Sequence, residues 1–214
     1  SKEVSMIFFI HGAGCTADAC PVADSLDALL GPMNRLGYSS AETWEASWAS
    51  LKSQTAGAGN NALFIGESMG GFWAAQLSRL YDARCYLLNP VIRCEWQMRQ
   101  FIGQVLQGGR PALTEANVRT FAAAPDQRVP LNAGRIGLML GRADMTIDPY
   151  YTEAFYAGHT DCVDWVDDGH AITAEANFAK IAERIAGWKD ESAFAYFLRR
   201  AKAAGEAAAD ALTA

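Results

Sequence analysis

The chain has 214 residues, and its 18 basic and 24 acidic side chains leave a formal charge of −6 at pH 7. Half of the residues are apolar and 20% are charged, a composition that excludes a disordered chain. The acidic balance, with an isoelectric point near 5.1, argues against nucleic acid or an anionic membrane surface as the partner. A chain of this length can bury one sizeable core, so a single domain is expected.

The cysteine pattern and the short apolar runs bear on the compartment. No apolar run approaches the ~20 residues of a membrane span, and the run over residues 6–10 leads into His11 and Gly12 rather than a signal-peptide cleavage site. Five cysteines are dispersed along the chain without a Cys-x-x-Cys pair: Cys15, Cys20, Cys85, Cys94 and Cys162. We therefore expect reduced thiols in a cytoplasmic protein. With only three histidines, a zinc site is disfavoured, and no metal or organic cofactor is expected.

The first sixty residues carry one clear strand signal and several weaker signals. A short apolar run predicts a buried strand over residues 6–10. Apolar residues at helical spacing predict a helix that begins at Pro21 and is closed by Gly37. In the weaker stretch that follows, we expect an edge strand within residues 38–46 and a short helix over residues 50–56.

The next part of the chain has stronger patterns. A loop rich in glycine and asparagine over residues 57–61 precedes a buried strand over residues 62–66. A helix over residues 70–81 and a buried strand over residues 85–88 follow. Residues 92–130 then interrupt this alternation, and we expect them to form a small helical cap at one end of the sheet.

Within this cap, helical patterns cover residues 94–106 and 114–123. The remaining predicted elements, in chain order, are a strand over residues 136–140, a helix over 149–157, a strand over 162–166 and a helix over 172–188. Strands that alternate with helices predict an α/β fold with a mainly parallel sheet. We expect one domain over residues 1–190 and an alanine-rich helical tail over residues 191–214. The tail either packs on its own domain or mediates a homodimer.

The strongest chemical signal is a G-x-S-x-G motif, Gly66-Glu67-Ser68-Met69-Gly70, between a predicted strand and a predicted helix. Such a turn strains the serine backbone and needs glycines beside it, where a side chain would collide with the neighbouring strand or helix. It lifts the hydroxyl of Ser68 out at the carboxyl end of the sheet, near the positive end of the helix. The motif is also compatible with a glycine-rich junction in which Ser68 is only the helix N-cap. Glu67 is expected to point away from the pocket and pair with a basic neighbour.

A serine nucleophile needs a base, and the expected chain order is serine, acid, histidine. His11 precedes Ser68 and therefore fails on order. His159 follows a predicted helix, where a helix C-cap facing solvent is expected. His170 follows a strand at the carboxyl end of the sheet, where catalytic groups gather, and is the preferred base. The structural alternative for His170 is a solvent-facing residue at a helix start.

The acid that orients the histidine belongs in the loop after the preceding strand. Asp144 lies in that loop and is the preferred acid, whereas Asp148 precedes Pro149 and suits a helix N-cap. The oxyanion needs backbone donors, for which we expect the amides of Met69 and Ala13.

Several further residues are candidates for binding substrate. Gly12 is the next candidate after Ala13 in the glycine-rich loop, and Cys15 would line the acyl site, although a place at a helix entry is preferred for Cys15. Trp96, Met98 and Phe101 would form an apolar acyl pocket if the cap is a lid, although their helical spacing is more typical of core packing.

Taken together, these residues and motifs resemble the α/β-hydrolase superfamily. Within it, the small size and the stretch Leu88-Asn89-Pro90-Val91-Ile92-Arg93 resemble the YqiA-type bacterial esterases, which carry a similar Asn-Pro-x-x-Arg sequence after the strand that follows the motif. The resemblance covers most of residues 6–188. It implies an α/β-hydrolase fold with helices on both faces of the sheet and a small helical cap. It also implies a serine hydrolase of short acyl esters with Ser68 as nucleophile, Asp144 as acid and His170 as base.

Three functional hypotheses follow. The first is a serine esterase acting on a small acyl ester through an acyl-enzyme. The second is a thioesterase or acyltransferase acting on a carrier-bound acyl group, with basic residues such as Arg93, Arg99 and Arg110 beside the entrance. The third is a non-catalytic ligand-binding protein on the hydrolase fold.

Overall fold

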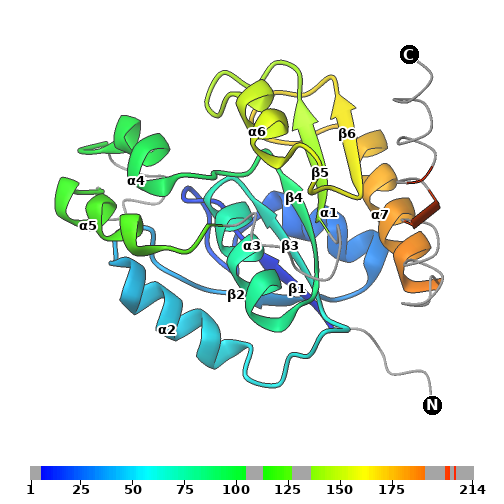
Figure 1. Ribbon diagram of the computed structural model, residues 1–214, viewed down its shortest axis with the longest axis horizontal. Helices are drawn as coiled ribbons and strands as arrows, with labels where there is room; N and C mark the ends of the chain where they lie inside the picture. Colours follow the sequence, from blue (N-terminus) through cyan, green and yellow to red (C-terminus); the bar gives the residue numbers. More distant parts are fainter. Residues whose placement is uncertain (1–5, 105–112, 127–135, 191–200, 203–204, 206–214) are drawn as a thin grey trace.

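The computed structural model describes residues 6–104, 113–126, 136–190, 201–202 and 205. Its centre is one six-stranded sheet in the order β2-β1-β3-β4-β5-β6, in which every neighbouring pair is parallel (Figure 1). The strands are β1 (Ile7–Ile10), β2 (Asn34–Leu36), β3 (Leu63–Glu67), β4 (Arg84–Leu88), β5 (Ile136–Gly141) and β6 (Cys162–Val166). The predicted α/β class and parallel sheet are therefore confirmed.

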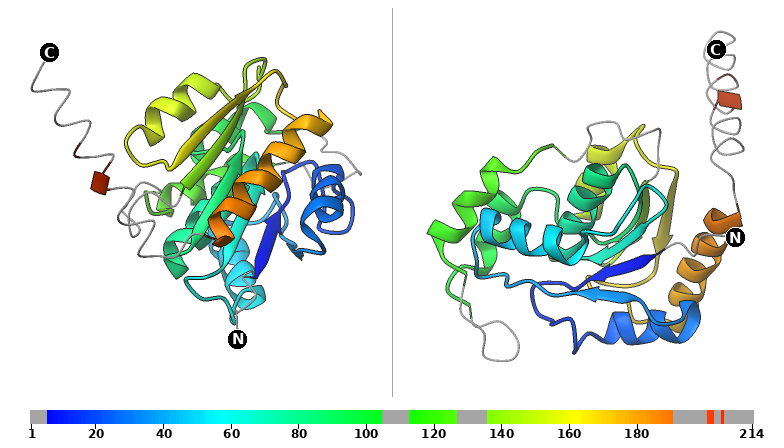
Figure 2. Two further views of the ribbon diagram at one scale, coloured as in Figure 1. Left: turned by 90° about the vertical axis from the view of Figure 1, so that its right-hand side faces the viewer. Right: turned by 90° about the horizontal axis from the view of Figure 1, so that it is seen from below.

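Helices cover both faces of this sheet. The α-helices are α1 (Pro21–Leu30), α2 (Trp44–Gln54), α3 (Met69–Tyr81), α4 (Cys94–Gln97), α5 (Glu115–Thr120), α6 (Pro149–Tyr156) and α7 (Glu175–Asp190). Two 3-10 helices, η1 (Met98–Phe101) and η2 (Phe121–Ala123), continue α4 and α5. Figure 2 shows α1 and α7 on one side of the sheet and α2 and α3 on the other.

The alternation of side chains along each strand divides the core into two layers. Phe8 and Ile10 of β1 pack with α2, α3 and the cap, whereas Ile7 and Phe9 pack with α1 and α7. The four inner strands, β1, β3, β4 and β5, are buried on both faces, which explains why their sequences are nearly continuous apolar runs. No helix among the described residues is long and apolar enough to cross a membrane.

The region after residue 30, where the sequence periodicity is weak, differs from its prediction. Helix α1 ends at Leu30, because Gly31 adopts a positive φ of 81°, and the edge strand β2 follows at Asn34–Leu36 rather than within residues 38–46. Helix α2 begins at Trp44, six residues earlier than expected, because the Thr43 side chain caps it by accepting from the Ala46 amide.

The segment expected to form a cap, residues 92–130 (called the cap below), contains less regular helix in its described part than the sequence pattern predicted. The helix predicted over residues 94–106 is a single α-helical turn, α4, followed by η1, and Ile102 then pairs with Leu113. The predicted helix over residues 114–123 is α5 followed by η2. The predicted tail helix lies outside the described residues, apart from positions 201, 202 and 205, which are helical.

Candidate active site

Ser68 occupies a sharp turn between β3 and α3, at the carboxyl end of the sheet. Its φ of 51° and ψ of −122° are a conformation that residues with a side chain rarely adopt. The turn is held at the backbone, since the Ser68 amide donates to the Leu88 carbonyl at 2.9 Å and the Ser68 carbonyl accepts from Val91 at 2.9 Å. Both ends of this peptide are therefore fixed against the end of β4.

The glycines on either side of the turn are required by contact with the backbone. A Cβ on Gly66 would overlap the carbonyl oxygen of Gly70, and a Cβ on Gly70 would overlap the carbonyl oxygen of Ile10 at the end of β1. The close crossing of α3 over β1 and β3 depends on these two positions, as the sequence motif predicted.

Ser68, His170 and Asp144 form one hydrogen-bonded chain. The Nε2 atom of His170 lies 2.9 Å from Ser68 Oγ, and its Nδ1 atom lies 2.8 Å from Asp144 Oδ2. With its proton on Nδ1, the ring donates to the Asp144 carboxylate and accepts from the Ser68 hydroxyl. The Asp144 side chain is fully buried, whereas 27% of the His170 side chain is exposed.

The two candidate acids have different partners. The second carboxylate oxygen of Asp144 accepts from the amides of Thr146 at 2.8 Å and Ile147 at 2.9 Å, which fixes its orientation toward His170. Asp148 instead caps α6 and accepts from the amide of Tyr150 at 2.9 Å. The position of Asp148 matches the helix N-cap that its place before Pro149 suggested.

Asn89 braces the loop that carries His170, a contact that sequence reasoning missed. Its side-chain amide donates to the carbonyls of Gly169 at 2.9 Å and His170 at 2.8 Å, and its oxygen accepts from Gly141 at 2.8 Å. The residue is 2% exposed and has a positive φ of 41°. An asparagine directly after a buried strand and before Pro90 was the available signal, because asparagine tolerates this left-handed conformation.

The loop after β1 passes directly beside the serine. A Cβ on Gly12 would lie 3.4 Å from Ser68 Cβ. Within the described residues, the amides of Ala13 and Met69 have no hydrogen-bond acceptor. His11 lies under the loop, 1% exposed, where its Nδ1 donates to the Gly12 carbonyl and its ring stacks on Tyr38.

Glu67, next to the serine, does not have the basic partner expected for it. No basic side chain in the described part of the chain pairs with this carboxylate. Its Oε1 atom accepts instead from the thiol of Cys20 at 3.1 Å and, at 3.4 Å, from the Gly12 amide.

Comparison with known proteins places the chain in a family. Residues 41–189, more than half of the chain, match the uncharacterised protein family UPF0227, which is YqiA-like. The chain belongs to this family. A search of curated protein sequences returned no match.

Solved structures similar to this UPF0227 member share its fold at low sequence identity. Est1E from Butyrivibrio proteoclasticus has a TM-score of 0.68 at 15% identity, over 87% of this chain and 89% of its own. The esterase domain of a Rhodothermus marinus protein has a TM-score of 0.65 at 15% identity, over 88% and 87%. A thermophilic esterase from Thermogutta terrifontis has a TM-score of 0.59 at 16% identity, over 86% and 89%. These similarities confirm the predicted α/β-hydrolase fold.

The cap of the UPF0227 protein borders a cavity of about 310 Å³ beside the Asp144 loop. Trp96 of α4 and Tyr151 of α6 meet edge to face at its wall, and Ile147 also lines it. Trp96 is 56% exposed, Met98 is 2% exposed within the core, and Phe101 is half-buried against the core. Of the three predicted pocket residues, Trp96 therefore lines this cavity and Met98 packs in the core.

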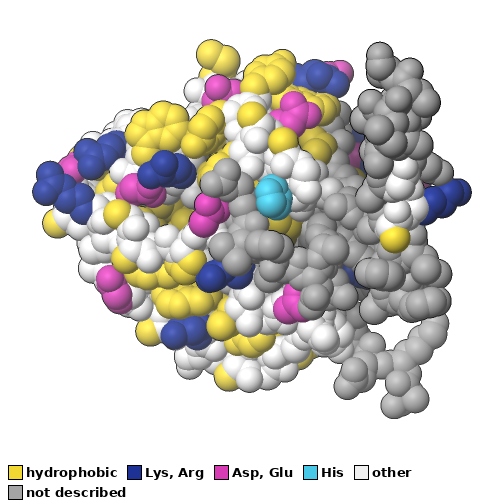
Figure 3. Space-filling view, in the orientation of Figure 1, with side chains coloured by type: hydrophobic (Ala, Val, Ile, Leu, Met, Phe, Trp, Pro, Cys, Tyr) yellow, Lys and Arg dark blue, Asp and Glu magenta, His cyan; other side chains and the backbone are white. Residues whose placement is uncertain are grey.

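Exposed apolar side chains gather along the upper edge of the face drawn in Figure 3. The large ones from the cap and the segment before and within α6 are Trp96, Met145 and Tyr150.

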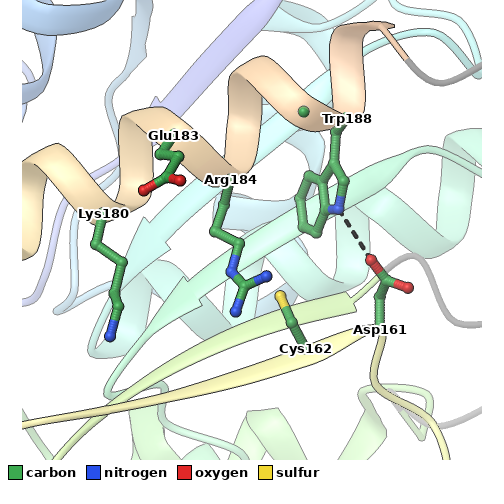
Figure 4. Close-up of a pocket in the computed structure, with 7 residues that line it drawn as sticks. Asp161, Cys162, Lys180, Glu183, Arg184 and Trp188 are labelled. Carbon is green, nitrogen blue, oxygen red and sulfur yellow. Dashed lines mark hydrogen bonds between the residues drawn. The ribbon is translucent and has the colours of Figure 1, made fainter.

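A larger cavity of about 630 Å³ lies between α7 and the start of β6, lined by Lys180, Arg184 and Cys162 among others (Figure 4). Because β6 begins there, this cavity lies at the opposite end of the strands from Ser68.

Proposed function

We propose that this protein is a serine hydrolase that cleaves carboxylic esters of small acyl groups through an acyl-enzyme. The observation that carries the proposal is the continuous hydrogen-bonded chain from Asp144 through His170 to Ser68. A serine hydroxyl is a weak nucleophile at neutral pH, and a histidine held by a buried carboxylate is the arrangement that activates it. The α/β-hydrolase fold supports the proposal, because this turn is where the fold presents its nucleophile.

In the proposed reaction, Ser68 Oγ attacks the acyl carbon while His170 Nε2 takes the hydroxyl proton. The amides of Ala13 and Met69 donate to the oxyanion, and their lack of acceptors within the described residues supports this role. His170 then returns the proton to the leaving alcohol, and the acyl group stays on Ser68. A water molecule, deprotonated by His170, releases the acid and restores Ser68.

We propose that the substrate is a small-molecule ester and that Trp96 forms one wall of its binding pocket, beside the Asp144 loop. Ala13, Gly12 and Cys15 remain proposed contacts on the other side of Ser68. The five free thiols support our placement of the reaction in a reducing compartment, the cytoplasm.

The thioesterase or acyltransferase alternative relies on basic residues near the entrance. Arg93 pairs with Glu95 at 2.6 Å and Arg99 pairs with Glu115 at 2.9 Å, whereas Arg110 lies outside the described residues. These pairings neutralise two of the three candidate cations, so we favour an uncharged ester substrate. A panel of aryl esters and acyl thioesters of matched acyl length separates the two reactions.

Labelling with a fluorophosphonate probe tests the catalytic proposal and separates it from a non-catalytic binding protein. We expect rapid labelling at Ser68, with loss of labelling and at least a ~10⁴-fold loss of turnover in Ser68→Ala. Ser53→Ala, on the exposed part of α2, is the matched control and should label normally. A folded wild-type protein that does not label would overturn the proposal.

A further inference from the structure

Three side chains of types that can bind a metal ion lie close together next to the serine turn. The sulfur atoms of Cys15 and Cys20 and a carboxylate oxygen of Glu67 all lie within 4.8 Å of one another. Cys15 comes from the loop after β1, Cys20 is the N-cap of α1, and Glu67 is the last residue of β3. Sequence spacing did not reveal this cluster, because Cys20 and Glu67 are 47 residues apart.

The cluster brings two thiols and a carboxylate together without a basic side chain paired to the carboxylate among the described residues. Cys20 is 1% exposed, and its thiol donates to Glu67 Oε1 at 3.1 Å. Among the described residues, Glu67 has no basic partner, and its other donor is the Gly12 amide at 3.4 Å. A cation between the three side chains would supply the missing charge.

We propose that Cys15, Cys20 and Glu67 form a binding site for a thiophilic divalent cation, and that Zn²⁺ is the ion it takes. Two thiolates and a carboxylate are ligands that Zn²⁺ accepts, and a water molecule completes a four-coordinate site. The separation of at most 4.8 Å between the donor atoms leaves only small side-chain movements to reach normal bond lengths of about 2.3 Å to sulfur and 2.1 Å to oxygen. Binding displaces the two thiol protons into solvent, so one ion releases two protons.

The proposed metal site does not include Ser68, His170 or Asp144, but it adjoins the turn that holds Ser68 and the loop that holds Ala13. Glu67 precedes Ser68 in the turn, and Cys15 lies two residues after Ala13. A bound ion would join the loop after β1, the start of α1 and the end of β3 at one point. The proposal concerns metal binding and does not depend on the esterase function.

Cobalt spectroscopy tests the site directly. The full chain, reduced and then desalted without oxygen, is titrated with Co²⁺, which reports thiolate ligands by charge-transfer absorption in the near ultraviolet. We expect one Co²⁺ per chain and displacement of the band by one equivalent of Zn²⁺. Ser68→Ala should bind identically, so the outcome is independent of any hydrolase activity.

Substitution of the ligands decides whether this cluster is the site. Cys15→Ser and Cys20→Ser should each halve the intensity of the Co²⁺ charge-transfer band. All three ligand variants, Cys15→Ser, Cys20→Ser and Glu67→Gln, should weaken Zn²⁺ binding at least ~10-fold. Cys162→Ser, at a half-buried thiol on β6, is the matched control and should bind as the wild type does. Because Cys15 is partly exposed, Cys15→Ser should fold even if the buried Cys20→Ser does not. The absence of a charge-transfer band, or an unchanged band in Cys15→Ser, would overturn the proposal.

Discussion

Asp144 and Asp148 show how two carboxylates four residues apart acquire different roles. Asp144 contacts His170, whereas the hydrogen bonds of Asp148 within the described part of the chain go to the start of α6. We expect Asp144→Asn to lower kcat by about 10³–10⁴-fold, because an amide neither selects the same ring tautomer nor stabilises the imidazolium. Asn is as good an N-cap as Asp, so Asp148→Asn should keep kcat within about threefold. Steady-state kinetics on an aryl ester checks both, and a larger loss in Asp148→Asn would reassign the acid.

Asn89 is expected to act as a positioning residue for His170. Asn89→Gly keeps the left-handed backbone accessible but removes the three side-chain hydrogen bonds to the ends of β5 and the His170 loop. We expect the rate of fluorophosphonate labelling to fall by about 10–100-fold, in the range reported for residues that orient functional side chains.

The matched control for Asn89 is Asp82→Gly, at the end of α3, where φ is also positive at 50°. It should leave the labelling rate unchanged. Equal labelling rates in Asn89→Gly and wild type would show that the side-chain hydrogen bonds of Asn89 do not orient His170, whatever the change in melting temperature.

At the residue scale, local motifs carried the prediction of the site. A strained serine between a strand and a helix, and a histidine after the last strand, are both visible in short windows of sequence. The contacts of Asn89 and of the Glu67 cluster were not predicted, because their partners lie 47 to 81 residues away along the chain and no sequence periodicity connects them. Such contacts depend on the order of strands in the sheet rather than on local propensity.

At the scale of elements, an aromatic cluster fixes the cap to the body of the protein. Phe121 of η2 is 2% exposed and lies against Trp44, Phe72 and Trp73, with ring centroids 5.5 to 6.3 Å apart. The amide of Trp44 also donates to the side chain of Thr120 at 2.8 Å. These contacts join the cap to α2 and α3.

We therefore expect Phe121→Ala to lower the free energy of unfolding by about 3–5 kcal/mol, through lost burial and the cavity left behind. Urea denaturation measures this loss. Phe121→Leu, which fills most of the volume, should cost less than about 1.5 kcal/mol. Equal stability of Phe121→Ala and wild type would mean that the cap moves independently of α2 and α3.

The helices and strands were predicted best where burial is complete. Strand β3 is shifted by one residue from its prediction and helix α3 begins one residue earlier than predicted. An uninterrupted apolar run, and a helix buried from Met69 to Ser78, leave a strong pattern. Strand β2 has three residues with only Leu36 buried, and α2 has few apolar positions, so neither has a clear periodicity. In the cap, helical spacing persists where the chain forms 3-10 turns, which share nearly the same period.

At the scale of the whole molecule, Asp164 joins three elements across the sheet. This buried carboxylate on β6 accepts from the Tyr86 hydroxyl of β4 at 2.7 Å and from Arg184 of α7 at 2.9 and 3.0 Å. Burial alone would raise the pKa of Asp164, but the hydrogen bonds from Arg184 and Tyr86 outweigh it and lower the pKa below its ordinary value.

The sign of this shift predicts the response to acid. Because the pKa is lower in the folded state, the ionised carboxylate stabilises the fold above about pH 4, and this stability is lost as the pH falls through the folded pKa. We expect Asp164→Asn to lower the free energy of unfolding by about 1–3 kcal/mol at pH 7 and by less at pH 3. Urea denaturation across this range measures the difference. Asp167→Asn, at a side chain 96% exposed, is the control, and a pH-independent difference would contradict the expectation.

The separation of 102 residues between Ser68 and His170 has a consequence for synthesis of the chain. At about 5–20 residues per second, the base leaves the ribosome roughly 5–20 s after the serine. During most of that interval β6 has not been made, and the proposed base, His170, is not available to Ser68. The proposed nucleophile therefore gains its proposed base only when the last strand of the sheet has joined β5.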